Sequence, residues 1–103
     1  MPNTRRLDRE IEQTTRKLEA VRQREMWPLN GRERRAVLAG LASGARKVVR
    51  GKSPARAERQ LETAWGVAES RLSGEITALE TERQRVLNEA ATAKAAKKSS
   101  SWW

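Results

Sequence analysis

Large apolar residues recur at steps of three and four in two separate stretches, and this spacing limits what the chain can fold into. In the first stretch the series is Leu7, Ile11, Thr14, Leu18 and Val21. In the second it is Leu61, Trp65, Ala68, Leu72, Ile76, Leu79, Arg83, Val86 and Ala90. Such steps align residues on one narrow helix face and are typical of a coiled-coil seam. They predict two long amphipathic helices, the second interrupted by Arg83.

Capping signals mark where these helices end and where a third helix lies between them. Thr4 is a plausible N-cap for the first helix, which should stop before Pro28 because the residue preceding a proline avoids helical geometry. Asn30 and Glu33 have the spacing of a capping box at the start of the middle helix. The predicted helices are therefore residues 4–26, 31–50 and 54–98.

The clearest boundary is the segment of residues 51–54. Gly51 can adopt the left-handed conformation that closes a helix, Ser53 can cap the next helix, and Pro54 is tolerated in its first turn. Residues 1–98 are therefore expected to form a single helical domain. The serine-rich residues 99–103 are expected to be a disordered tail.

The predicted fold class is all-α: an antiparallel helical hairpin, or coiled-coil stalk, with a short central helix forming a small three-helix head. In this arrangement Leu7 lies near residues 86–90 and Val21 lies near Leu72, while Trp27 meets Trp65 at the head. The apolar face of the middle helix is predicted to be Val37, Leu38, Leu41, Ala45, Val48 and Val49. Its small residues Ala36, Gly40 and Gly44, spaced at four, permit close approach of another helix.

The composition argues against an enzyme. The chain contains no cysteine and no histidine, so the usual general base, the best nucleophile and the soft metal ligands are missing. We therefore expect no catalytic residues, no metal, no cofactor and no small-molecule substrate. No apolar run approaches the roughly 18 residues of a membrane span, and no apolar core follows the N-terminal arginines. The expected location is cytoplasmic.

The net charge of +9 is concentrated in one part of the chain. Residues 30–59 hold nine basic and two acidic side chains, against seven and five in residues 1–29 and three and six in residues 60–90. A face that is only solvated usually mixes both signs, so this bias favours an anionic partner. The candidate nucleic-acid-binding residues are Arg32, Arg35, Arg46, Lys47, Arg50, Lys52, Arg56 and Arg59.

Three functions are compatible with these features. The first is a nucleic-acid-binding accessory protein, contacting DNA or RNA through the basic residues. The second is a coiled-coil interaction or assembly module (an adaptor, scaffold or inhibitor) that binds an acidic protein. The third is a peripheral membrane protein, because Trp102 and Trp103 could contact a protein or a membrane interface. A two-helix seam of this length is marginal alone, so we also expect a homodimer.

Overall fold

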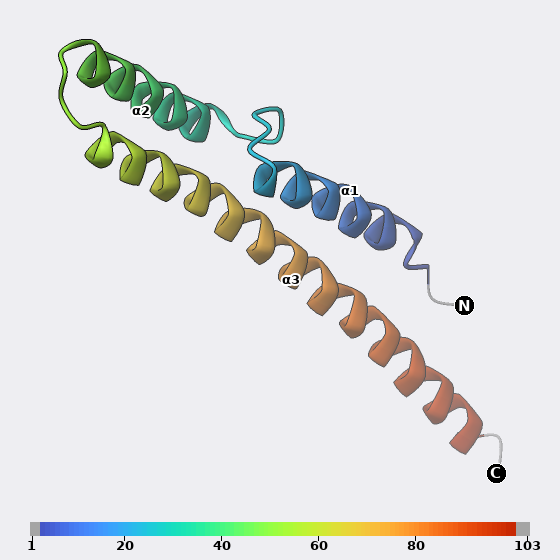
Figure 1. Ribbon diagram of the computed structural model, residues 1–103. Helices are drawn as coiled ribbons and strands as arrows, with labels where there is room; N and C mark the ends of the chain where they lie inside the picture. Colours follow the sequence, from blue (N-terminus) through green and yellow to red (C-terminus); the bar gives the residue numbers. More distant parts are fainter. Residues whose placement is uncertain (1–2, 101–103) are drawn as a thin grey trace.

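The structure, a computed structural model, describes residues 3–100, which form three helices and no strand (Figure 1). Helix α1 spans Arg5–Arg22, α2 spans Gly31–Val49 and α3 spans Ala55–Ser100. Helices α2 and α1 lie one after the other along α3, and each packs against it. The Cα radius of gyration is 21.9 Å, against about 13 Å for a compact chain of 100 residues. The predicted fold class, an all-α elongated hairpin, is confirmed.

The three helices meet in one hydrophobic cluster, which forms the small head. Its two largest fully buried side chains from different helices are Leu72 of α3 and Val21 of α1. Within residues 3–100, α1 and α2 each contact α3 but not one another. Helix α3 is therefore the element on which both of the other helices pack. The buried members of the cluster are Leu18, Val21, Leu29, Val37, Ala64, Trp65, Ala68 and Leu72.

The stalk is the pairing of α1 with α3, and it follows the predicted seam. Leu7, Leu18 and Val21 are buried, as is Thr14, whose hydroxyl donates to the Glu10 carbonyl at 2.8 Å. The two helices run antiparallel, because Asp8 pairs with Arg83 and Arg22 pairs with Glu69. Arg83, which interrupts the apolar series, therefore forms an ion pair between helices, with 2.6 Å between its Nε and Asp8 Oδ1.

Helix α1 ends at Arg22, four residues before the predicted end. Arg24 takes a left-handed backbone conformation, with φ of 64°. The Glu25 N–H donates to the Ala20 carbonyl and the Arg24 N–H to the Val21 carbonyl, both at 2.9 Å. These are the two hydrogen bonds of a Schellman motif, which satisfies the last carbonyls of a helix. Pro28 therefore limits how far the helix can extend but does not determine its last residue.

The side chain of Arg24 explains why a non-glycine residue occupies this position. Its guanidinium pairs with Glu62 at 2.8 Å and lies over the Trp65 ring, 5.4 Å from the centroid. Both contacts come from α3 and offset the strain of the left-handed backbone. The expected meeting of Trp27 with Trp65 is wrong: Trp27 is 57% exposed, and Met26 packs against the cluster instead.

The N-cap position of α1 is Thr4, as predicted, but its side chain makes no capping hydrogen bond. The Thr4 hydroxyl donates to Asp8 Oδ2 at 3.0 Å. The carboxamide oxygen of Asn3 accepts from the Arg5 N–H at 3.2 Å. The orphan donors at this helix start are therefore only partly satisfied by side chains.

Helix α2 is rotated relative to the predicted apolar face. The residues it buries are Glu33, Val37 and Gly40, whereas Leu38 and Leu41 are each 50% exposed. Val48 and Val49 are 60% and 87% exposed. The predicted face is therefore correct for Val37 and wrong for most of its other large residues.

The rotation follows from how closely α2 approaches α3. A Cβ atom on Gly40 would lie 2.9 Å from Leu61 Cγ, and one on Gly44 would lie 3.4 Å from the Ala57 Cβ. Glycine at these positions lets α2 settle on Ala57 and Leu61 without a side chain between the helices. The close contact between α2 and α3 therefore requires that Gly40 and Gly44 face α3, and Leu38 and Leu41 face away from it.

Helix α2 closes as predicted. Gly51 has φ of 71°, and the Lys52 N–H donates to the Lys47 carbonyl at 2.8 Å. Ser53 Oγ then accepts from the Ala55 N–H at 3.3 Å, at the start of α3. Helix α3 continues through residue 100, two residues into the tail predicted from residue 99. The rest of that tail, including Trp102 and Trp103, lies outside the described residues.

Gly40→Ala tests the close helix approach. The added methyl group must displace Leu61, so we expect this variant to be less stable than Gly74→Ala by about 1–3 kcal/mol. Gly74 is the matched control, because a Cβ there meets nothing within 4 Å and alanine raises helix propensity. Urea unfolding measures both variants. Equal stabilities would contradict the close approach.

Candidate nucleic-acid interface

The interface is built on α2, whose position is fixed by one carboxylate. Glu33 and Asn30 form the predicted capping box: the Glu33 N–H donates to Asn30 Oδ1 at 2.9 Å, and the Asn30 N–H donates to Glu33 Oε1 at 3.0 Å. The Glu33 carboxylate also accepts from Arg71 of α3, at 2.8 Å from Nε and 2.9 Å from Nη2. A buried helix cap is therefore also one half of a bidentate ion pair.

Arg71 extends this network in two directions. Its Nη2 also donates to the Pro28 carbonyl at 3.1 Å, and its Nη1 pairs with Glu75 at 3.1 Å. The Arg71 guanidinium holds the pKa of Glu33 below its ordinary value, against the opposing effect of burial. The same hydrogen bonds raise the pKa of Arg71. The network ties the loop before α2, the start of α2 and the middle of α3 together.

The candidate residues lie at the end of the molecule formed by α2 and the start of α3. We call them the basic surface. All of them are exposed except Lys47, which is half-buried. Arg46, Lys47, Arg50 and Lys52 surround a shallow depression of about 250 Å³ together with Ser43. The structure thus brings four of the predicted residues together at the closed end of α2.

The remaining members are connected through α3. Arg56 and Arg59 border a depression that also includes Gln60 and Thr63. Gln60 and Thr63 line a second depression of about 450 Å³ as well, and Arg32 of α2 borders it. Arg32 therefore lies on the same side of the head as these two arginines. Arg35 is exposed on α2 but lines none of these three depressions.

The basic surface lacks internal partners. Among residues 3–100, none of its eight side chains forms an ion pair or a hydrogen bond. Six arginines elsewhere are paired with carboxylates. Four of them (Arg22, Arg24, Arg71 and Arg83) join different segments of the chain, whereas Arg16 and Arg85 pair within their own helix. The paired arginines are Arg16, Arg22, Arg24, Arg71, Arg83 and Arg85.

Sequence reasoning missed the polar residues between the basic groups. Gln60 and Thr63 line the depressions beside Arg56 and Arg59. Gln60 lies four residues after Arg56 and Thr63 lies four residues after Arg59, so each shares a face of α3 with one arginine, and this signal could have identified them. The Gln60 carboxamide can donate hydrogen bonds to phosphate or sugar oxygens, whereas the Thr63 hydroxyl already donates to the Arg59 carbonyl at 2.9 Å.

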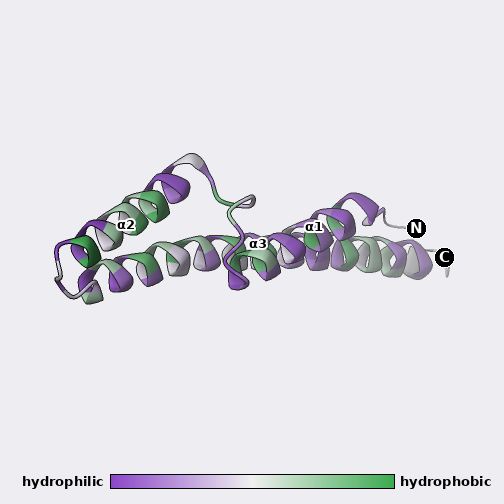
Figure 2. Cartoon of the chain, turned by 45° about the horizontal axis from the view of Figure 1, so that its top comes forward, coloured by the Kyte–Doolittle hydropathy of each residue, from purple (hydrophilic) through white to green (hydrophobic). Residues whose placement is uncertain are grey.

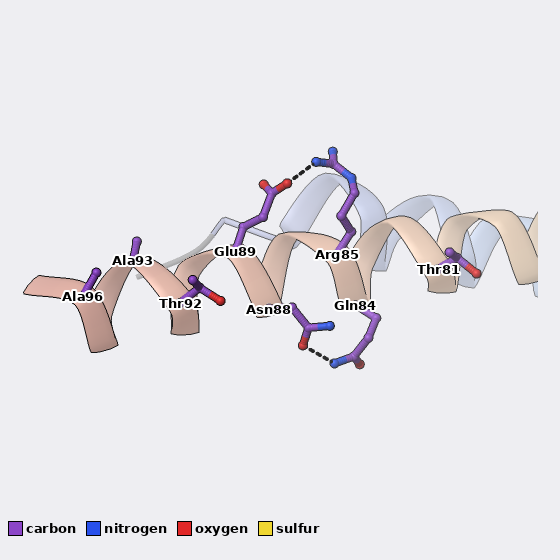
Figure 3. A pocket seen from close by; sticks show the side chains of 8 residues that line it. All are labelled: Thr81, Gln84, Arg85, Asn88, Glu89, Thr92, Ala93 and Ala96. Carbon is purple, nitrogen blue, oxygen red and sulfur yellow. Dashed lines mark hydrogen bonds and ion pairs between the residues drawn. The ribbon is translucent and has the colours of Figure 1, made fainter.

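A broader depression of about 780 Å³ lies on the later half of α3 (Figure 3). Four of its polar side chains pair with one another: Arg85 pairs with Glu89 at 2.6 Å, and Gln84 donates to Asn88 at 2.9 Å. Arg85 also pairs with Glu82, and this pair lowers the pKa of Glu82. A hollow along one helix with paired charges offers no converging groups for a ligand.

Other kinds of site find no support in the described part of the chain. Between residues 3 and 100, no group of three acidic, histidine or cysteine residues is arranged to hold a metal ion. No helix there is long and apolar enough to cross a membrane. Comparison with known proteins finds no matching family model, no similar curated protein and no similar solved structure. The interpretation of the surface therefore rests on its own chemistry.

Glu33→Gln tests the network that positions α2. The pKa of Glu33 in the folded state lies below its ordinary value of 4.5, so the stabilisation by the ion pair is present above pH 4.5 and is lost as the pH falls through the folded-state pKa. The variant should be less stable at pH 7 by about 1–3 kcal/mol. It should also lose less stability than the wild type between pH 5 and pH 3 in urea unfolding.

Glu80→Gln is the matched control, because Glu80 is exposed and forms no ion pair within the described range. It should follow the wild-type curve throughout. A Glu33→Gln curve parallel to that of the wild type would show that the carboxylate charge does not hold α2 in place.

Proposed function

We propose that this chain is a nucleic-acid-binding accessory protein that contacts phosphates through the basic surface. One observation carries the proposal: eight basic side chains lie on α2, the turn after it and the start of α3 without an internal partner in the described structure, and this segment (residues 30–59) has only two acidic side chains. We propose a binding role in the cytoplasm rather than a catalytic one.

The chemistry of the surface suits phosphate. Six of its eight members are arginines, whose planar guanidinium binds phosphate oxygens in a bidentate manner. A polyanion that binds them releases its condensed counterions, so affinity should fall steeply as salt rises. Contacts of this kind position a protein on the backbone without reading bases. We therefore propose binding with little sequence preference.

Changing Arg46 and Arg50 together to alanine tests the proposal. We expect weaker binding to duplex DNA or structured RNA, because two phosphate contacts are lost. The slope of log K against log salt should also fall by roughly 1–2. Fluorescence anisotropy between about 50 and 200 mM salt measures both quantities. Helicity should not change and the melting temperature should not fall, because both side chains are exposed.

The matched control is Arg5→Ala with Arg9→Ala. These are also exposed arginines four residues apart on one helix, and neither forms an ion pair in the described structure. The control removes the same charge and should bind nearly as well as the wild type. Equal losses in both double variants would assign the attraction to net charge alone. Absence of wild-type binding at about 50 mM salt would overturn the proposal.

We also propose that two copies associate through their stalks. Ile11, Ile76, Leu79 and Val86 lie on the α1–α3 pair and are only half-buried. A groove of about 400 Å³ runs between the two helices, with Thr14, Ala78 and Leu79 among its lining residues. Two paired helices cover each other on one side only, and a four-helix stalk would cover these residues.

Light scattering tests the stalk dimer. We expect a dimer at micromolar concentration and a melting temperature that rises with protein concentration. Leu79→Ser should weaken association by about tenfold or more, since it removes apolar area from the groove. Val67→Ser is the control, because Val67 is already 57% exposed and lies outside the stalk groove. A monomer at every concentration with an unchanging melting temperature would contradict the dimer.

A further inference from the structure

Helix α2 exposes an apolar flank that neither the hydrophobic cluster nor the basic surface uses. Leu38, Leu41, Val48 and Val49 are at least half exposed, and Ala45 between them is exposed as well. We call these five residues the apolar flank. Its two leucines and two valines are four of the six exposed large apolar residues between residues 3 and 100. Figure 2 shows apolar and polar residues alternating along α2, and α3 is the one helix of residues 3–100 that α2 packs on.

The spacing of the apolar flank has the pattern of a helix-binding stripe. Its members follow one another at steps of three, four, three and one, and a rotation of about 100° per residue places most of them within one narrow strip. The strip runs about 17 Å along the helix, or three turns. A strip this narrow is complementary to one partner helix, since helix-in-groove recognition uses anchors at i, i+3, i+4 and i+7.

The charges around the flank identify the kind of helix that fits. Arg34, Arg35 and Arg46 are the charged residues of α2 nearest to it along the helix surface, and all three are exposed without a partner in the described structure. Glu33 is the only acidic residue of α2, and it is buried against Arg71. A helix docked on the flank therefore meets positive charge from α2.

We infer that the apolar flank of α2 binds an amphipathic helix of another protein, with leucine-like anchors bordered by aspartate or glutamate. A second copy of this chain fits less well, because residues 30–59 carry nine basic and two acidic side chains and two such heads repel each other. A lipid surface fits less well too, because the flank is a narrow strip rather than a broad apolar face with a high apolar moment.

The apolar flank shares no residue with the basic surface, although Arg35 and Arg46 of that surface border it, and its binding of a helix does not depend on nucleic-acid binding. A rotation of about 100° per residue places the centre of the flank roughly a third of a turn from Arg46 and Arg50. Both sites can therefore be occupied together. An acidic helix on the flank would also compete weakly for the nearby arginines, which would couple the two ligands electrostatically.

A synthetic peptide tests the inference. The probe is a rhodamine-labelled peptide of about 20 residues made of Leu, Ala and Glu, with leucines at i, i+3, i+4 and i+7. A scrambled peptide of the same composition has no such stripe. The full chain should bind the patterned peptide at least about tenfold more tightly than the scrambled one in fluorescence anisotropy.

Leu38→Ser with Leu41→Ser should weaken binding of the patterned peptide by about tenfold or more, because two anchor contacts are lost. Val67→Ser, which removes an exposed valine from α3, should leave binding unchanged. Circular dichroism should show that all three proteins keep their helicity. The Leu38/Leu41 variant should bind DNA like the wild type, which separates failure at this site from failure at the basic surface.

Four outcomes would overturn the inference. Equal affinity for the patterned and scrambled peptides, or no loss in the Leu38/Leu41 variant, would leave only charge attraction. Dimerisation that Leu38→Ser and Leu41→Ser abolish would assign the flank to a second copy. Pelleting with phosphatidylglycerol vesicles that the same changes abolish, without specific peptide binding, would assign the flank to a membrane.

Discussion

The position of α2 depends on the contact between Glu33 and Arg71. Its packing on α3 uses Gly40 and Gly44, which bring the helices close but bury little apolar area of their own. The buried Glu33 carboxylate supplies orientation as well, because it caps α2 and accepts two hydrogen bonds from α3. The Glu33 network and the close contact at Gly40 and Gly44 therefore select together which side of α2 faces the core, and the basic surface and apolar flank follow from that choice.

The distribution of ion pairs separates the structural arginines from those available to a partner. Arg71, Arg83 and Arg24 are each held by a carboxylate of another segment and join two parts of the chain. Residues 30–59 contain only two acidic side chains, and one of them is Glu33. The basic surface thus cannot be neutralised by its own segment. Its self-repulsion costs folding stability, and an anionic ligand would relieve that cost.

The parts of the fold that periodicity and capping control could be predicted. Leu7, Leu18 and Leu72 are buried because the hydrophobic effect and the helical repeat select the same face. The capping box at Asn30 and the left-handed Gly51 are local features with local signals. The end of α1 could not be predicted, because Arg24 is held by Glu62 and Trp65, which lie far away in sequence.

The rotation of α2 could not be predicted for a related reason. A hydrophobic pattern gives most weight to the largest side chains, so it selects Leu38 and Leu41 for the core. The contact distance between helices depends instead on the smallest side chains, and here it selects Gly40. For the candidate site, the number and positions of the basic residues can be read from the sequence, but which of them form ion pairs cannot. Arg71 finds Glu33 across 38 residues, and only the fold brings them together.

The rotation also has a functional consequence. If Leu38 and Leu41 faced α3, α2 would present a single solvent face, basic and opposite its core. Because the glycine stripe faces α3 instead, α2 has three distinct sides: a buried side, a basic side and an apolar side. A helix held by small residues on a long support is able to contact two partners at once. Gly40 and Gly44 lower the helix propensity of α2. Because they face α3, however, they leave the apolar flank exposed.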